Sequence, residues 1–156
     1  MSSPTSTNKG DLKRIIKCFC GCTDMTVEEV RRIYRLANSV RETLLDSEAS
    51  RLLRQFMTLH RSGDRSEAEQ YLDIYEKCSE FLKEDQHTFA QNNIEELCDL
   101  GLPYDLEQDM TRRMLNGQQT DIKLGLNRIQ GKCCKEIEVS QNFDDFKKAI
   151  LKKLAH

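Results

Sequence analysis

The strongest pattern of hydrophobic positions lies in residues 66–82, which read SEAEQYLDIYEKCSEFL. Apolar residues recur there mostly at steps of three and four, which places them on one wide stripe of a helix. The stripe comprises Tyr71, Leu72, Ile74, Tyr75, Cys78, Phe81 and Leu82. Ser66, followed three residues later by Glu69, is typical of a capping box at a helix start. We therefore predict a buried central helix over residues 66–82.

Apolar stripes with helical spacing cover most of the remaining chain. A second capping box, Thr26 with Glu29, predicts a helix over residues 26–45 that breaks near Asn38 and Ser39. Further helices are predicted over residues 47–60, 85–100, 106–116, 121–139 and 143–154. Their boundaries are marked by Asp105, Thr120 and Asn142 as caps, by Gly63 and Gly117 as breakers, and by Gly101, Leu102 and Pro103 as a stop.

No stretch alternates clearly enough to predict a strand, and no internal repeat is visible. Residues 1–11 are polar and lack periodicity, so we expect them to be disordered. Residues 12–22, LKRIIKCFCGC, place Leu12, Ile15, Ile16 and Phe19 at helical spacing between basic residues. The predicted fold class is all-α, a single compact bundle of about eight to nine short helices over residues 12–156.

Composition narrows the class of protein. The chain has 156 residues, of which 38% are hydrophobic and 32% charged, and this suits one soluble domain. Its formal charge of −2 argues against nucleic acid as the main partner. No apolar run approaches the length of a membrane span, and the polar start predicts no secretory signal. We therefore predict a cytoplasmic protein whose seven cysteines are reduced thiols.

The sequence shows no constellation of residues that predicts catalysis. His60, His87 and His156 are not spaced as metal ligands relative to one another, and we expect His60 and His87 to be structural or surface residues. The glycines are scattered and form no phosphate-binding loop. The carboxylates spread over helix faces as solvated charges. We predict a protein that is not itself an enzyme and that uses no cofactor.

Cys18, Cys20 and Cys22 form an unusual cluster. Their alternate spacing lacks the gap of roughly two to four residues between ligands of common zinc sites, so we expect no structural metal there. Three interpretations stay open: inert small hydrophobic thiols, reversible acylation, and a metal site completed by a distant fourth ligand. Acylation beside the basic residues of an amphipathic segment predicts peripheral membrane contact through this segment.

The order and content of the predicted helices resemble the regulator-of-G-protein-signalling (RGS) domain, from about residue 30 to residue 154. The stretch VRRIYRLANSVRETLLDSEASRLLRQFM is similar to the family's opening, with Tyr34 near its Trp position. The segments LGLPYDLEQDMTRRML and NFDDFKKAIL look like the family's Ile-Asn-Leu-Asp segment and the Asp-Ser-Tyr-x-x-Phe-Leu of its last helix. Residues 66–82 resemble its Ser-Glu-Glu-Asn-Ile-x-Phe-Trp-x-x-Cys-Glu, with matches at Leu72, Ile74, Tyr75, Cys78 and Phe81.

The resemblance implies a protein that binds an activated Gα subunit, the GTP-hydrolysing subunit of a heterotrimeric G protein. Family members have no catalytic residue of their own. They hold the switch regions of Gα in their transition-state geometry through polar residues on three loops. Aligned with the family, those partner-binding positions fall on Glu69, Gln70, Tyr71, Gly101, Leu102, Gln141, Asn142 and Asp145.

The residues at these positions differ from those of the family. An Asn of the first loop falls on Tyr71 or Glu69, depending on the alignment register, and a second Asn falls on Gly101. Asp145 stands where the family has Arg, which reverses a charge at the implied interface. We therefore expect a Gα-binding regulator with weak or absent GTPase acceleration. The alternative is an RGS-homology interaction module, a scaffold or adaptor, whose partner is not a Gα subunit.

Overall fold

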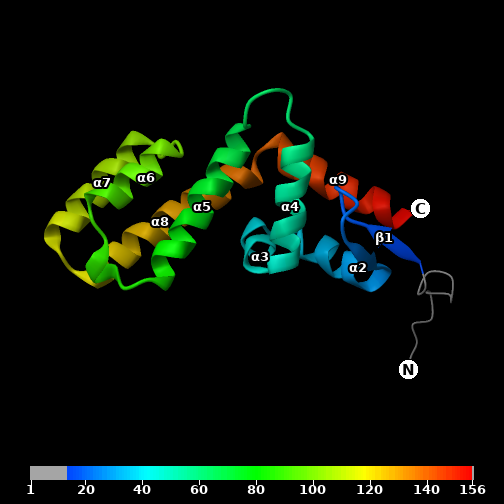
Figure 1. Ribbon diagram of the computed structural model, residues 1–156, viewed down its shortest axis with the longest axis horizontal. Helices are drawn as coiled ribbons and strands as arrows, with labels where there is room; N and C mark the ends of the chain where they lie inside the picture. Colours follow the sequence, from blue (N-terminus) through cyan, green and yellow to red (C-terminus); the bar gives the residue numbers. More distant parts are fainter. Residues whose placement is uncertain (1–13, 156) are drawn as a thin grey trace. The chain divides into compact units, whose positions relative to one another are not determined.

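The computed structural model describes residues 14–155, and these are almost entirely helical (Figure 1). The predicted all-α class is confirmed, because eight α-helices dominate this part of the chain. In chain order the elements are β1 (Ile15–Lys17), β2 (Asp24–Thr26), α2 (Val27–Leu36), α3 (Val40–Leu45), α4 (Ser47–Leu59), α5 (Glu67–Lys83), the 3-10 helix η1 (Gln86–Thr88), α6 (Gln91–Asp99), α7 (Tyr104–Asn116), α8 (Gln119–Glu138) and α9 (Gln141–Ala155). The predicted disorder of residues 1–11 lies outside the described residues.

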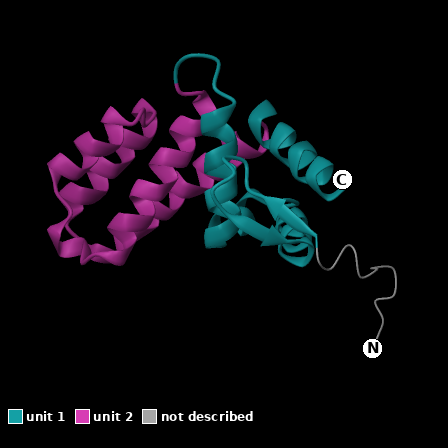
Figure 2. Ribbon diagram, turned by 45° about the vertical axis from the view of Figure 1, so that its right-hand side comes forward, with its two compact units in different colours: residues 1–64, 141–156 teal, residues 65–140 magenta. Residues whose placement is uncertain are grey.

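The chain divides into two compact units, which Figure 2 shows in teal and magenta. Unit 1 takes in the chain up to Asp64 and again from Gln141 onward, so it contains the strands, α2, α3, α4 and α9. Unit 2 is the continuous segment from Arg65 to Ser140, with α5, η1, α6, α7 and α8. Each unit has apolar residues of its own that are fully buried, among them Phe146 in unit 1 and Leu126 in unit 2.

The central helix predicted over residues 66–82 is confirmed as α5, and it packs along α8 within unit 2. The capping box forms as expected, with Ser66 and Glu69 each accepting a backbone N–H of the other. Gln130 of α8 adds a polar link, because its Nε2 donates to the Tyr75 carbonyl at 3.0 Å and to Ser79 Oγ at 2.8 Å. The buried residues on the two helices include Leu72, Ile74, Tyr75, Cys78 and Phe81 on α5 and Ile122, Leu126, Ile129, Cys133 and Ile137 on α8.

Capping residues account for several other helix boundaries. Thr26 begins α2 with the predicted capping box, and Ser39 begins α3 by accepting the Glu42 N–H at 3.2 Å. The predicted break near Asn38 and Ser39 is therefore confirmed. Gly117 ends α7 with a φ of 76°, a left-handed conformation that suits glycine because it has no Cβ.

Residues 14–22, the described part of the segment 12–22, do not form the helix that its spacing indicated. Within the described part, β1 pairs antiparallel with β2, with Ile16 opposite Met25. Each strand buries its middle residue and exposes the two flanking ones. The expectation that the chain has no strand was wrong here. The residues of β1, Ile15, Ile16 and Lys17, do not alternate between apolar and polar, because Ile15 is apolar yet exposed.

Three predicted caps and one predicted helix also differ from the structure. The helices begin after Pro103, after Gln118 and at Gln141, so Asp105, Thr120 and Asn142 lie inside their first turns. Proline favours a helix start because its fixed φ already fits. The segment 85–100 is interrupted by extended Phe89 and Ala90. The Asp85 carboxylate caps η1, and α6 begins at Gln91 with the Asn93 side chain accepting the Ala90 N–H at 2.8 Å. Among residues 14–155, no helix has the combination of length and hydropathy that crossing a membrane requires.

Candidate functional site

The turn between β1 and β2, residues 18–23, gathers three thiols, and we call it the thiol turn. Its backbone is closed by two hydrogen bonds, from Cys18 N–H to the Thr23 carbonyl at 3.0 Å and from Gly21 N–H to the Cys18 carbonyl at 3.2 Å. Gly21 has a φ of 80°, which a residue with a Cβ adopts only with strain. The chain therefore reverses within the turn and brings its first and last cysteines together.

The three sulfur atoms of the thiol turn converge on one point. All lie within 4.8 Å of one another, and they are the one group of three or more His, Cys, Asp or Glu residues in the described chain arranged to hold a metal. Cys18 Sγ is 3.5 Å from Cys20 Sγ and 3.6 Å from Cys22 Sγ, and the last two are 2.8 Å apart. Cys18 is buried, whereas Cys20 and Cys22 are exposed. The sequence identified the cluster, but only the turn shows that its side chains meet.

The surroundings of Cys18 favour its thiolate. Burial opposes ionisation, but the Thr23 N–H donates to Cys18 Sγ at 3.3 Å and the thiols of Cys20 and Cys22 also lie within hydrogen-bonding distance. These hydrogen bonds outweigh burial and lower the pKa of Cys18 to about 6. Burial alone raises the pKa of Cys78, in α5, to about 12. Hydrogen bonding in the thiol turn therefore lowers the pKa of Cys18, whereas burial in α5 raises that of Cys78.

Aromatic and basic side chains flank the thiol turn within unit 1. The Phe19 ring meets the Phe56 ring of α4 edge to face, with centroids 5.2 Å apart. Lys153 of α9 places its Nζ 4.9 Å from the Phe19 centroid and donates to the Lys17 carbonyl at 2.8 Å. Phe19 is thereby held on its neighbours, and the backbone on both sides of Cys18 is fixed.

Two segments implied by the RGS resemblance lie together in unit 2. Gln70 is in the first turn of α5, and Gly101 is in the turn between α6 and α7. A methyl group added at Gly101 would lie only 2.9 Å from Gln70 Oε1. Arg65 joins the same two segments, because it forms an ion pair with Asp73 of α5 and donates to the Leu100 carbonyl at 3.2 Å. Gln70 is half-buried and Gly101 is exposed, and we call the region around these two residues the Gln70 surface.

The remaining implied positions of unit 2 have different surroundings. Glu69 is fully buried and its carboxylate accepts the Ser66 N–H at 3.1 Å, so it serves the helix cap. Leu102 is buried, and its N–H donates to the Leu97 carbonyl at 3.1 Å. Tyr71 is half-buried, and burial together with nearby carboxylates raises the pKa of its hydroxyl. The charged residues that act on the Tyr71 hydroxyl include Glu136 and Lys132 of α8. Glu69 and Leu102 hold the backbone beside Gln70 and Gly101 in place.

The third implied segment begins α9, in unit 1. Gln141 and Asp145 are exposed, and Gln141 Nε2 donates to Asp145 Oδ1 at 2.8 Å. Asn142 lies between them in the first turn and is half-buried. The structure thus brings Gln141 and Asp145 together on one exposed face of α9.

The sequence analysis did not single out Arg65, a basic residue in the predicted loop 61–65. In the structure its side chain connects α5 to the α6–α7 turn.

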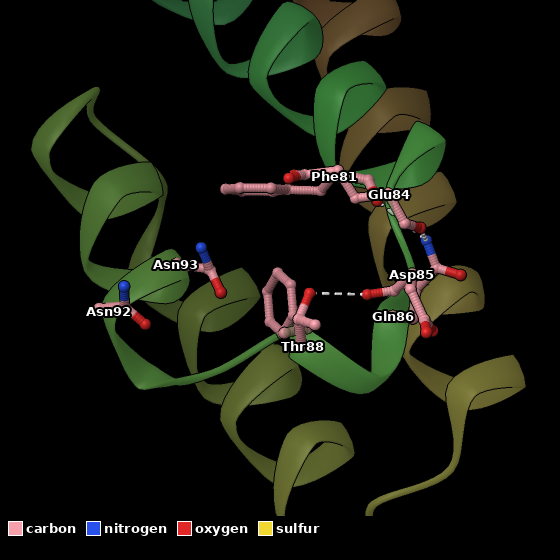
Figure 3. A pocket seen from close by; sticks show the side chains of 8 residues that line it. Phe81, Glu84, Asp85, Gln86, Thr88, Asn92 and Asn93 are labelled. Atoms are coloured by element: carbon pink, nitrogen blue, oxygen red, sulfur yellow. Dashed lines mark hydrogen bonds between the residues drawn. The ribbon is translucent and has the colours of Figure 1, made fainter.

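A polar hollow of about 120 Å³ lies where the chain passes from α5 through η1 to α6 (Figure 3). The rings of Phe81 and Phe89 meet edge to face there, with centroids 5.4 Å apart. Thr88 Oγ1 donates to the Asp85 carbonyl at 2.8 Å, and Gln86 Nε2 donates to the Phe81 carbonyl at 2.9 Å. These bonds satisfy the backbone where the chain reverses, so we assign the hollow a structural role.

No known protein family, curated protein or solved structure matches this chain. Its function is therefore inferred from the residues and their geometry.

Proposed function

We propose that this chain is an RGS-like regulator that binds an activated Gα subunit and accelerates its GTPase weakly or not at all. The observation that carries the proposal is the Gln70 surface, where two segments of the implied contact face lie side by side. A methyl group at Gly101 would come within 2.9 Å of Gln70 Oε1, so the two segments form one continuous surface. The buried residues of α5 support the same assignment, because the positions that match the family's core are buried.

Weak acceleration follows from the side chains on that surface. Only interactions that are stronger in the transition state than in the ground state speed hydrolysis. An Asn amide both donates and accepts at short reach from the backbone, whereas Tyr71 carries its hydroxyl at the far end of a half-buried ring. Glu69 has only acceptors, which the cap already uses, and Gly101 has no side chain. Losing one such positioned contact costs roughly 10²–10³ in rate.

Asp145 adds a repulsive contribution on the third segment wherever the partner is acidic. Its Oδ1 accepts from Gln141 Nε2 at 2.8 Å, so the carboxylate is held on the exposed face of α9. Like-charge contacts at an interface reduce affinity for the wrong partner more than well-matched pairs raise it for the right one. We therefore expect partner choice among Gα subunits to differ from that of ordinary family members.

The test compares binding and catalysis over a panel of Gα subunits. We expect at least one Gα, loaded with GDP and aluminium fluoride, to bind at least about tenfold more tightly than the same Gα with GDP alone. Single-turnover GTP hydrolysis by that Gα should rise less than about tenfold. Gln70→Lys should weaken binding, and the exposed Asn92→Lys, which makes the same charge change at the start of α6, should leave binding unchanged.

A second function, an interaction module with a partner other than Gα, is favoured by Tyr104. This residue begins α7, three positions after Gly101, and it is 72% exposed. Exposed aromatic side chains are enriched at protein interfaces, whereas the contact amides of the family are absent here. Failure of every Gα to bind in either nucleotide state would leave this alternative and overturn the first proposal.

A further inference from the structure

We propose that Cys18, Cys20 and Cys22 bind one soft metal cation, Zn²⁺ or Cu⁺, through their three sulfur atoms. All three cysteines lie in unit 1, and the proposal does not rest on Gα binding. Thiolates are the ligands that these two ions share, and soft sulfur donors discriminate against Mg²⁺ and Ca²⁺.

The sulfur positions fit one ion. Three ligands on a four-coordinate zinc with Zn–S bonds of about 2.3 Å lie about 3.8 Å apart. Cys18 Sγ is already 3.5 Å and 3.6 Å from the other two sulfurs. The Cys20 and Cys22 sulfurs, 2.8 Å apart, must separate by about 1 Å, and both side chains are exposed. The backbone therefore needs no rearrangement to form the site.

The spacing of these cysteines along the chain argued against a zinc site, but the turn changes that argument. Separation along the chain matters only as far as it determines separation in space. The φ of 80° at Gly21 and the hydrogen bond between Cys18 N–H and the Thr23 carbonyl reverse the chain inside the cluster. One short turn between the paired strands β1 and β2 therefore brings the three sulfurs close enough to bind one ion.

Hydrogen-bond donors and one guanidinium group lie close to the sulfur cluster. The Thr23 N–H donates to Cys18 Sγ at 3.3 Å, and Gln55 Nε2 lies 3.9 Å from Cys22 Sγ. Arg51 Nη1 donates to Thr23 Oγ1 at 3.1 Å, which places a guanidinium beside the turn. Each thiol that binds releases one proton to solvent as its metal–sulfur bond forms, so three thiolates leave a net charge of −1 with Zn²⁺ and −2 with Cu⁺. The nearby basic and amide groups offset this negative charge.

The coordination number separates the two ions. Within residues 14–155, no His, Asp, Glu or fourth Cys side chain joins the sulfur cluster. Zinc prefers four ligands and would complete its shell with water or with a ligand from a bound partner. Cuprous ion is satisfied by soft sulfur donors and needs no such addition. The proposal covers the shared thiolate site, and metal titrations decide which ion it takes.

The experiment uses the full chain, fully reduced and metal-free, with all seven thiols counted before titration. Zn²⁺ is titrated against a colorimetric zinc chelator and Cu⁺ against a cuprous chelator, and Co²⁺ provides the absorption of thiolate coordination. We expect one ion per chain with a Kd below about 1 μM for at least one of the two metals. The thiol count excludes a disulfide between Cys20 and Cys22 as a cause of weak binding.

Two variants test the assignment of the ligands. Cys20→Ser and Cys22→Ser change exposed side chains and should each weaken binding more than about 100-fold, the upper range for loss of an outer-shell partner. Cys98→Ser, at a half-buried cysteine in unit 2, is the matched control and should bind like the natural chain. Binding weaker than about 1 μM for both metals, or binding unchanged in both turn variants, overturns the proposal.

Discussion

Gly125 is buried and Gly131 is half-buried inside α8, and the two glycines differ in the space available for a side chain. A Cβ at Gly125 would collide with Met110 and would lie 2.6 Å from Arg113 Cδ, whereas nothing lies within 4 Å of a Cβ at Gly131. Arg113 cannot easily move aside, because it forms ion pairs with Asp109 and Asp121. Close approach of α7 and α8 thus depends on one glycine and not on the other.

We predict opposite effects of alanine at these two positions. Gly125→Ala should lower the free energy of unfolding by about 1–3 kcal/mol, because overpacking forces side chains out of place. Gly131→Ala should raise it by about 0.5–1 kcal/mol, because alanine loses less backbone entropy in a helix. Urea denaturation of both variants checks the pair. Equal stability changes would mean that the α7–α8 contact is looser than the structure shows.

Asp109 is a buried carboxylate on α7, 4% exposed, that forms ion pairs with Arg112, Arg113 and Arg128. Burial acts to raise its pKa, but the hydrogen bonds and charges of Arg113 and Arg128 prevail and hold the pKa of Asp109 below its usual range. Asp109→Asn should therefore destabilise unit 2 by about 2 kcal/mol at pH 7, since the arginines lose a charged partner.

The pH dependence of this effect has a definite sign. The folded-state pKa of Asp109 is lower than the unfolded value of about 3.9, so its contribution is complete above that pH and is lost as the pH falls through the folded-state pKa. The difference in stability between the natural chain and Asp109→Asn should shrink in acid. A difference that stays constant from pH 7 to about pH 3 would show that the loss comes from packing rather than charge.

At the scale of elements, prediction from sequence succeeded where a stripe and a cap agreed. In α5 the capping box at Ser66 and the buried stripe marked the same helix, and both are confirmed. In β1 the sequence carries no strand pattern, because exposed Ile15 is as apolar as buried Ile16 and both stand at helical spacing with other apolar residues. The strand is instead stabilised by β2 across the thiol turn, a non-local pairing that periodicity within one segment does not encode.

The stripe of α5 makes a further prediction. Ile74 is completely buried and Leu82 is half-buried on the same helix. Ile74→Ala should lower the free energy of unfolding by about 2–5 kcal/mol, because it removes buried area and leaves a cavity in the core of unit 2. Leu82→Ala, the control at a partly exposed site, should cost less. Thermal unfolding followed by helical circular dichroism measures both, and a change below about 0.5 kcal/mol for Ile74→Ala would mean that this position is not core.

At the scale of the whole molecule, the sequence indicated candidate functional residues but not how those residues meet in space. It singled out Gln70, Gly101 and the cysteine cluster by residue type and position. The approach of Gln70 to Gly101 depends on how α5 and the α6–α7 turn pack, and the meeting of the thiols depends on a reversed turn. Both are tertiary features that side-chain spacing along the chain does not specify.

The proposed RGS-like function predicts a gain of function when residues at which this chain differs from the family are replaced. We predict that Tyr71→Asn combined with Asp145→Arg raises GTPase acceleration at least about tenfold over the natural chain, in single turnover with a Gα that binds it. The amide restores a two-way hydrogen bond and the arginine removes a repulsive charge. Gly101 is left unchanged, because its φ of 107° would strain an asparagine there.

The single variants separate the two contributions, and Asn92→Arg controls for added charge at an exposed site of unit 2. Asp145→Arg alone should improve binding to an acidic partner with little effect on the bound rate, because a charge far from the reacting phosphate acts on both states alike. Tyr71→Asn alone should raise the bound rate, because its amide acts where the switch geometry is fixed. If the natural chain already accelerates a Gα subunit more than about tenfold, the interpretation of Tyr71, Gly101 and Asp145 is wrong, and an ordinary Gα regulator remains.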